Sequence, residues 1–104
     1  MHLGEFFGPA EVSSSVPAAS ATSIELLSKN PDRRMVTVFN HSGAALFLKM
    51  GPTAAVTDFT VKLASGSFYE FSLPIHTGSV SGIWDAAAGH AMITTYSAPE
   101  FRFP

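Results

Sequence analysis

Residues 34–50 read RMVTVFNHSGAALFLKM, and this stretch decides the fold class. Its first part, 34–40, is rich in the β-branched and aromatic residues that favour strands. The run stops at His41-Ser42-Gly43, which we interpret as a compact hairpin turn. The second part, ALFLKM, places its two leucines on one face of an alternating strand. Two short strands joined by a turn are therefore expected here.

Similar runs lie on both sides of this stretch and are separated by turn residues. The predicted strands cover residues 23–27, 34–40, 45–50, 59–63, 67–71, 78–84 and 91–96. A spacing of roughly 10–12 residues between such runs is typical of a sandwich or a small barrel. We predict an all-β fold, a single antiparallel, jelly-roll-like β-sandwich of about seven or eight short strands. The residues expected to pack in its core or at an interface are Val36, Val38, Leu46, Leu48, Phe59, Val61, Leu63, Phe71, Ile83 and Trp84.

The N-terminal region lacks the strand pattern. Pro9 and Pro17 break any helical period there, so we predict an extended arm over 1–20, a sandwich domain over 21–97 and a tail over 98–104. The side chains expected to contact a partner are Leu3, Phe6, Phe7, Val12, Val16, Arg33, Arg34, Phe101 and Phe103. A disordered terminus, and a pair of arginines that only keeps a strand entry soluble, remain open alternatives.

The composition limits the class of protein. The chain has 104 residues, of which 46% are hydrophobic and only 13% charged, and its formal net charge is −2. This length predicts one domain, and the charge argues against nucleic-acid binding, which depends on neutralising phosphates. There is no cysteine, no apolar run of ~18 residues and no signal-peptide pattern. We therefore expect a soluble protein made in a cytoplasm, without disulfides or a membrane span.

Two predicted strands carry bulky apolar groups on both faces, MVTVF at 35–39 and SFYEF at 67–71. An antiparallel sheet with one solvated face would alternate apolar and polar residues instead. These strands are expected either to lie at a subunit interface or to be covered by the arm. We favour an oligomer.

The histidines raise the question of a metal site. The chain has four of them, His2, His41, His76 and His90. They form no His-x-His pair, and the last three lie in or next to predicted turns, whereas a metal needs ligands that converge. In 82–96, GIWDAAAGHAMITTY, we interpret Asp85 and His90 as the two ends of a turn without a third group to complete a site. We predict no metal and no cofactor.

The sequence also lacks the residue patterns of common catalytic sites. No serine lies in a nucleophile-elbow motif, and the candidate acids Asp58, Glu70 and Asp85 form no convincing pair for glycoside hydrolysis. We predict no catalytic residue and no enzymatic activity. Six aromatic residues could instead form a sugar-stacking platform, although packing in a core or interface is the simpler interpretation. They are Phe47, Phe68, Tyr69, Phe71, Trp84 and Tyr96.

An ordered series of motifs resembles a family. ATSIELLSKNPDRRMVTVFNHSGAALFLKMG, then FTVKLASGSFYEF, then TGSVSGIWDAAAGHAMITTY together resemble a small β-sandwich module of tailed-bacteriophage virion proteins. The resemblance covers about residues 21–97, and this chain has Phe47 and Phe68 where the family usually has tyrosine. It implies a structural part of a phage head, neck or fibre.

The resemblance, joined to two apolar extensions and no fibre shaft, leads to a specific expectation. We expect a non-enzymatic capsid decoration or cement protein that binds the major capsid protein and stabilises the head. It would be a homotrimer on the outer surface of the virion, made in the host cytoplasm. The alternative is a glycan- or receptor-binding module of a phage tail or head fibre.

Overall fold

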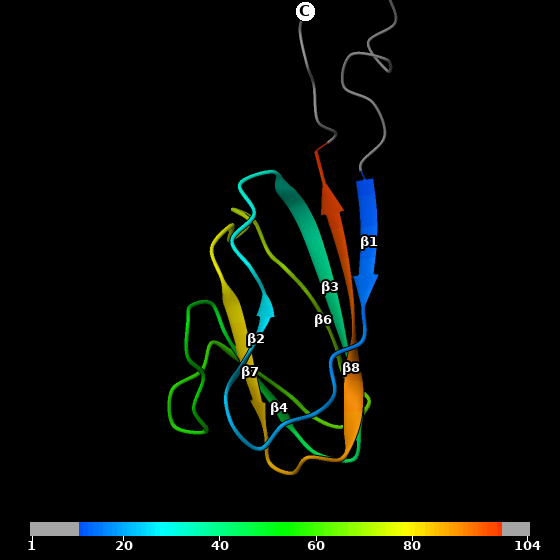
Figure 1. Cartoon of the computed structure of the whole chain (residues 1–104), viewed down its shortest axis with the longest axis vertical. Helices are drawn as coiled ribbons and strands as arrows, with labels where there is room; N and C mark the ends of the chain where they lie inside the picture. The colour runs from blue at the N-terminus through cyan, green and yellow to red at the C-terminus, as the bar shows by residue number, and fades with distance from the viewer. Residues whose placement is uncertain (1–10, 99–104) are drawn as a thin grey trace, which may run out of the picture.

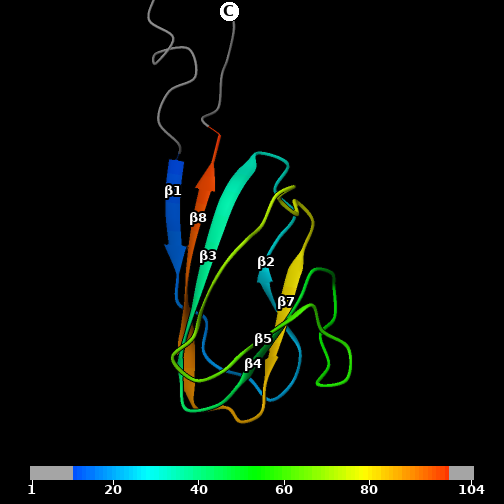
Figure 2. The same cartoon turned by 180° about the vertical axis from the view of Figure 1, so that it is seen from behind.

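The computed structural model describes residues 11–98, which form eight strands and no helix. The strands are β1 (Glu11–Ser15), β2 (Ile24–Leu27), β3 (Arg33–Ser42), β4 (Leu46–Lys49), β5 (Val61–Leu63), β6 (Phe68–Glu70), β7 (Val80–Trp84) and β8 (Gly89–Ser97). They pair antiparallel in two four-stranded sheets that face each other (Figures 1 and 2). The predicted all-β sandwich is confirmed.

The strand order has the nested form of a jelly roll. Sheet A has the order β1-β8-β3-β6, and sheet B has the order β2-β7-β4-β5. First pairs with last, second with seventh, third with sixth and fourth with fifth, as in a long hairpin rolled upon itself. The chain therefore changes sheet at every connection except the one between β4 and β5.

This topology corrects two details of the sequence interpretation. The turn after β3 does not form a hairpin, because β3 lies in sheet A and β4 in sheet B. The loop DAAA between β7 and β8 likewise passes from sheet B to sheet A rather than joining a paired hairpin. A turn motif specifies the change of direction, and the twist and packing of the sheets decide which strand becomes the neighbour.

The described part of the predicted arm belongs to the sandwich. β1 pairs with β8 from Glu11↔Ser97 to Ser15↔Ile93, and the chain continues along β8 as far as a bridge between Ala18 and His90. Extended conformation was expected here, but the structure adds this segment to its own sheet as an edge strand. The predicted contacts Leu3, Phe6, Phe7, Phe101 and Phe103 lie outside the described residues.

The core lies between the sheets and is centred on Trp84, which is 1% exposed. Eight of the ten predicted packing residues are either buried or packed partly buried against this core, namely Val36, Val38, Leu46, Leu48, Val61, Leu63, Phe71 and Trp84. Phe59 is not in it, because β5 starts only at Val61 and Phe59 belongs to the preceding loop, 40% exposed. Ile83 is half-buried and points to the other face of sheet B, since Trp84 and Gly82 take the inward positions of β7.

Candidate binding face

The outward-facing side of sheet A carries two apolar rows and a polar row between them. The strand register forms the first apolar row from Val12, Tyr96 and Met35. The second apolar row consists of Met92, Phe39 and Phe68. The polar row between them consists of Ser14, Thr94, Thr37 and Glu70. We call these three rows the outer face of sheet A.

Four of the six residues in the apolar rows are exposed to solvent, whereas Met35 and Phe39 are half-buried. Val12 is 58% exposed, Phe68 57%, Met92 49% and Tyr96 36%. The alternate residues of the same strands, such as Val38 and Ile93, point inward and form the core. The outward-facing apolar residues are therefore additional to those that the core of the sandwich needs. Contiguous exposed apolar patches mark interaction surfaces more often than scattered apolar residues do.

The outer face of sheet B differs because the chain itself covers it. Phe47 points outward from β4 but is only 6% exposed. The Phe59 ring packs edge-on against it with 5.0 Å between centroids, and the Lys62 ammonium lies 5.5 Å from the Phe47 ring centroid. Phe59 comes from the long loop between β4 and β5, which both views show at the side of sheet B (Figures 1 and 2).

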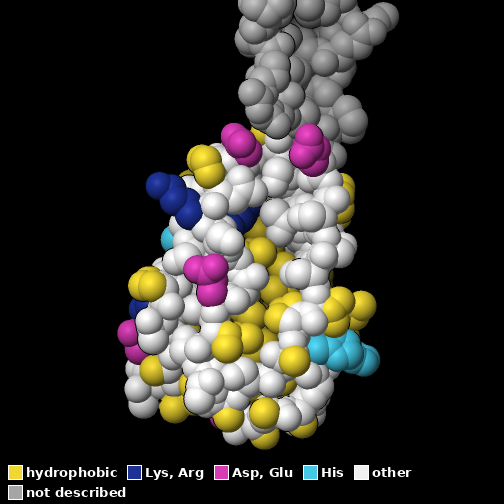
Figure 3. Space-filling view, viewed as in Figure 1, with side chains coloured by type: hydrophobic (Ala, Val, Ile, Leu, Met, Phe, Trp, Pro, Cys, Tyr) yellow, Lys and Arg dark blue, Asp and Glu magenta, His cyan; other side chains and the backbone are white. Residues whose placement is uncertain are grey.

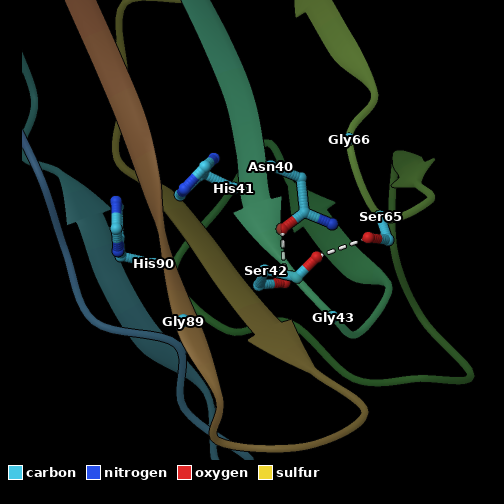
Figure 4. Close-up of a pocket in the computed structure, with 8 residues that line it drawn as sticks. All are labelled: Asn40, His41, Ser42, Gly43, Ser65, Gly66, Gly89 and His90. Carbon is cyan, nitrogen blue, oxygen red and sulfur yellow. Dashed lines mark hydrogen bonds between the residues drawn. The ribbon is translucent and has the colours of Figure 1, made fainter.

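Two histidines lie at one end of sheet A. His41 of β3 and His90 of β8 are directly opposite in the register, and their ring centroids are 4.9 Å apart. Figure 4 shows the two imidazoles side by side, with the Asn40 side chain on the other side of β3. In the space-filling view, histidine side chains gather next to apolar ones at the right-hand edge (Figure 3). Sequence reasoning missed this pair, because only the β3–β8 pairing brings residues 41 and 90 together.

An open depression of about 470 Å³ adjoins this pair. Its lining residues are Asn40, His41, Ser42, Gly43, Ser65, Gly66, Gly89 and His90 (Figure 4). Gly89 has φ 97°, and a Cβ there would lie 2.7 Å from the Ser42 Cα, so this close approach of backbone requires glycine.

The polar side chains of the depression hold the fold together. The Asn40 Nδ2 donates to the Ala44 carbonyl at 2.8 Å and to the Leu63 carbonyl at 2.9 Å. Its Oδ1 accepts from Ser42 Oγ at 2.7 Å and from the Trp84 Nε1 at 3.2 Å. Asn40 is completely buried, so these bonds satisfy it in a site that water does not reach.

The structure corrects the prediction that Arg33 contacts a partner. It is only 5% exposed, and its guanidinium donates to the carbonyls of Ser28, His76 and Gly78 at 2.7, 2.7 and 3.0 Å. Desolvation by burial lowers its pKa from the ordinary value. Arg33 therefore fastens two loops to the start of β3, while its neighbour Arg34 is exposed.

The remaining predicted site residues divide between surface and core. Val12 and Val16 are exposed, at 58% and 57%, and are available for contact. The sugar-stacking platform is not assembled, because Phe47, Phe71 and Trp84 are all buried. Asp85 is exposed in the loop after β7, as expected for a turn residue.

Among residues 11–98, no three or more His, Asp and Glu side chains group closely enough to hold a metal ion by themselves. The described strands and loops likewise include no helix long and apolar enough to cross a membrane.

Comparison with known proteins finds little. No protein-family model and no curated protein matches the chain. One solved structure that matches is from a study of Bacillus endospore appendages described as disulfide-linked pili. It has a TM-score of 0.44 and 19% identity, and the match covers 89% of this chain and 94% of that one. The likeness is too distant to carry an argument about function, and the 104 residues contain no cysteine for such links.

These findings correct the functional expectation. The prediction of a bacteriophage capsid decoration protein is contradicted: no phage family model matches the chain, and the structure that matches comes from a study of Bacillus endospore appendages. The part of the resemblance that the structure supports is the small β-rich fold. The fibre-module alternative depends on the same resemblance, which no family model supports. The virion location and the major capsid protein as partner stay predictions.

Proposed function

We propose that this chain is a non-enzymatic structural module that associates with further copies of itself through the outer face of sheet A. The observation that supports the proposal is the row formed by Met92, Phe39 and Phe68 on three adjacent strands. Two of its members are 49% and 57% exposed. Removing apolar surface from water contributes about 25 cal/mol per Å², so a partner that covers this row gains affinity from it.

A second copy fits this face better than a partner of different chemistry. Glu70 is its one formally charged residue, and it lies on β6 at the edge of the sheet. Two such faces related by a twofold axis would meet apolar row to apolar row, with little like-charge repulsion. Sheets that pack face to face through apolar side chains lie about 10 Å apart, as the two sheets of a sandwich do.

The area of this face fits a weak interface. The strands of sheet A have 5, 9, 10 and 3 residues, which is 27 residues in all. Each strand residue covers about 16 Å² of a sheet, so the face offers roughly 430 Å² per copy, or roughly 860 Å² in total. This total lies at the low end of protein interfaces, where transient complexes are found. We expect reversible association.

The non-enzymatic part of the proposal is supported by how the polar groups are used. Asn40, Ser42 and Ser65 line the depression, yet each hydrogen-bonds to the chain's own backbone or side chains. Ser65 Oγ, for example, donates to the Ser42 carbonyl at 2.5 Å. Groups engaged in holding turns are poor candidates for nucleophiles or bases.

Analytical ultracentrifugation of the full chain over a range of concentrations tests the proposal. We expect a concentration-dependent species of twice the chain mass of 11.0 kDa. Met92→Glu and Phe68→Glu should each shift it to monomer without changing the far-UV circular dichroism. Leu73→Glu is the matched control, because Leu73 is 81% exposed but lies off this face.

A monomer at all concentrations, or equal effects of all three variants, would contradict the proposal. A mass of three chains would favour the homotrimer expected from the sequence and would exclude a face-to-face pair.

A further inference from the structure

We propose that His41 and His90 together bind one divalent transition-metal ion. The two residues are opposite each other on β3 and β8, with 4.9 Å between ring centroids and 45° between ring planes. Two imidazole nitrogens that each lie about 2.1 Å from one tetrahedral metal place their ring centroids about 5 Å apart. The observed separation therefore already suits a shared ion.

The ligand chemistry narrows the choice of metal. Imidazole nitrogen suits Zn²⁺, Cu²⁺ and Ni²⁺, whereas Mg²⁺ and Ca²⁺ prefer oxygen. His41 is exposed and His90 is half-buried, so water can reach the pair and fill the other coordination positions. Such a two-histidine site is open, and we expect it to bind more weakly than a structural site with four protein ligands.

Strand pairing holds the backbone of both histidines. The β3–β8 pairing runs without a break from Met35↔Tyr96 to Ser42↔Gly89, so it extends through the His41↔His90 pair. The next pair, Ser42 with Gly89, is held in close approach, and Ser42 also bonds to Asn40. Since the two Cα positions are held, metal binding requires only side-chain rotation, and little ordering of the backbone opposes it.

The site adjoins the face proposed for self-association, because the ring centroids of His41 and Phe39 are 5.8 Å apart. One chain supplies both histidines, so the metal site does not need a second copy. A Phe68→Glu variant that no longer associates should therefore still bind one metal per chain, which separates the two proposals.

Isothermal titration calorimetry with ZnCl₂ on untagged protein tests the proposal, with MgCl₂ as the negative control. The titration uses a His2→Gln background, so that the N-terminal histidine cannot contribute a ligand. We expect one Zn²⁺ per chain, and at least about tenfold weaker binding in His41→Gln and in His90→Gln. His76→Gln is the matched control, because the His76 Nε2 lies 2.9 Å from the Ser79 carbonyl and away from the pair.

Proton NMR of the imidazole ring hydrogens gives a direct second readout. Zn²⁺ should shift the ring signals of His41 and His90 and leave those of His76 in place. Binding should weaken as the pH is lowered, because only a neutral imidazole can donate its lone pair to a metal. Absence of Zn²⁺ binding, or equal loss in His76→Gln, would overturn the proposal and leave the pair as a structural contact between rings.

Discussion

The two sheets of this sandwich have similar apolar strands but differ in what covers their outer faces. On sheet B, Phe47 points outward and is nearly buried, because Phe59 and Lys62 lie against it. On sheet A, Phe68 points outward and is 57% exposed. Both are aromatic residues in short strands, so the strand sequence alone does not account for the difference.

The difference follows from the connections. β4 and β5 are consecutive strands of the same sheet, and the residues between them form a long loop that folds back over sheet B. Lys49 and Asp58 stabilise this loop through an ion pair at 2.6 Å, and Ser23 Oγ accepts from the Ala54 amide at 2.9 Å. The neighbours of sheet A are instead joined through the opposite sheet, and no described segment returns over its outer face. Sheet B therefore buries its outward-facing aromatic residue within its own chain, whereas sheet A leaves apolar side chains exposed on its outer face.

The largest loss of stability is expected from a change in the buried polar cluster around Asn40, which joins the two sheets. Asn40→Ala would leave the Ala44 and Leu63 carbonyls and the Trp84 Nε1 without their partners in a dry site. We expect a loss of about 3–5 kcal/mol in the free energy of unfolding, measured by urea denaturation. Asn30→Ala is the control. Asn30 is half-buried, donates to Ser97 Oγ at 2.9 Å and accepts from the Asp32 amide at 3.0 Å, so its loss should cost about 1–2 kcal/mol. Equal losses in the two variants would show that the two faces do not depend on a common polar core.

An intermediate effect is expected where the cover of sheet B is removed. Phe59→Ser would take away the ring that packs 5.0 Å from Phe47 and expose Phe47 to water. The lost burial predicts a decrease of about 1–2 kcal/mol in the free energy of unfolding, together with increased binding of a hydrophobic dye. Unchanged stability would mean that this loop does not protect sheet B, and the contrast between the faces would be lost.

The smallest effect is expected for the matched change on sheet A. Phe68→Ser removes a side chain that is already mostly in water, so the monomer should change by no more than about 0.5 kcal/mol. The measurement belongs at protein concentrations low enough to keep the chain monomeric, since association would add stability. A loss as large as that of Phe59→Ser would show that Phe68 packs within its own chain, which would weaken the proposed binding face.

Much of the fold was predictable from local patterns. Alternation in segments such as 45–50, and the turn residues between the segments, predicted seven strands. The structure confirms all seven, as β2 to β8, with ends that differ by a few residues. β1 was missed because EVSSS has a single apolar residue, Val12, and therefore shows no alternation. It forms a strand through its pairing with the edge of β8. Phe59 was misplaced by extending the alternation of Val61 and Leu63 two residues too far.

The candidate sites were less predictable than the fold. The apolar character of both faces of MVTVF and SFYEF correctly drew attention to these strands, but which of their faces is open could not be read from the sequence. Arg33 had the pattern of an exposed charge at a strand start, yet it is buried among three loop carbonyls. His41 and His90 are paired by the register of two strands that a turn motif does not join.

The sequence by itself determined the class of fold and the position of most strands, because alternation and turn preferences act between residues that are close in the chain. Tertiary structure decided which strands share a sheet, which outer face the β4–β5 loop covers and which histidines meet. These features depend on pairing between residues far apart in the sequence, and that pairing is selected by packing the whole core.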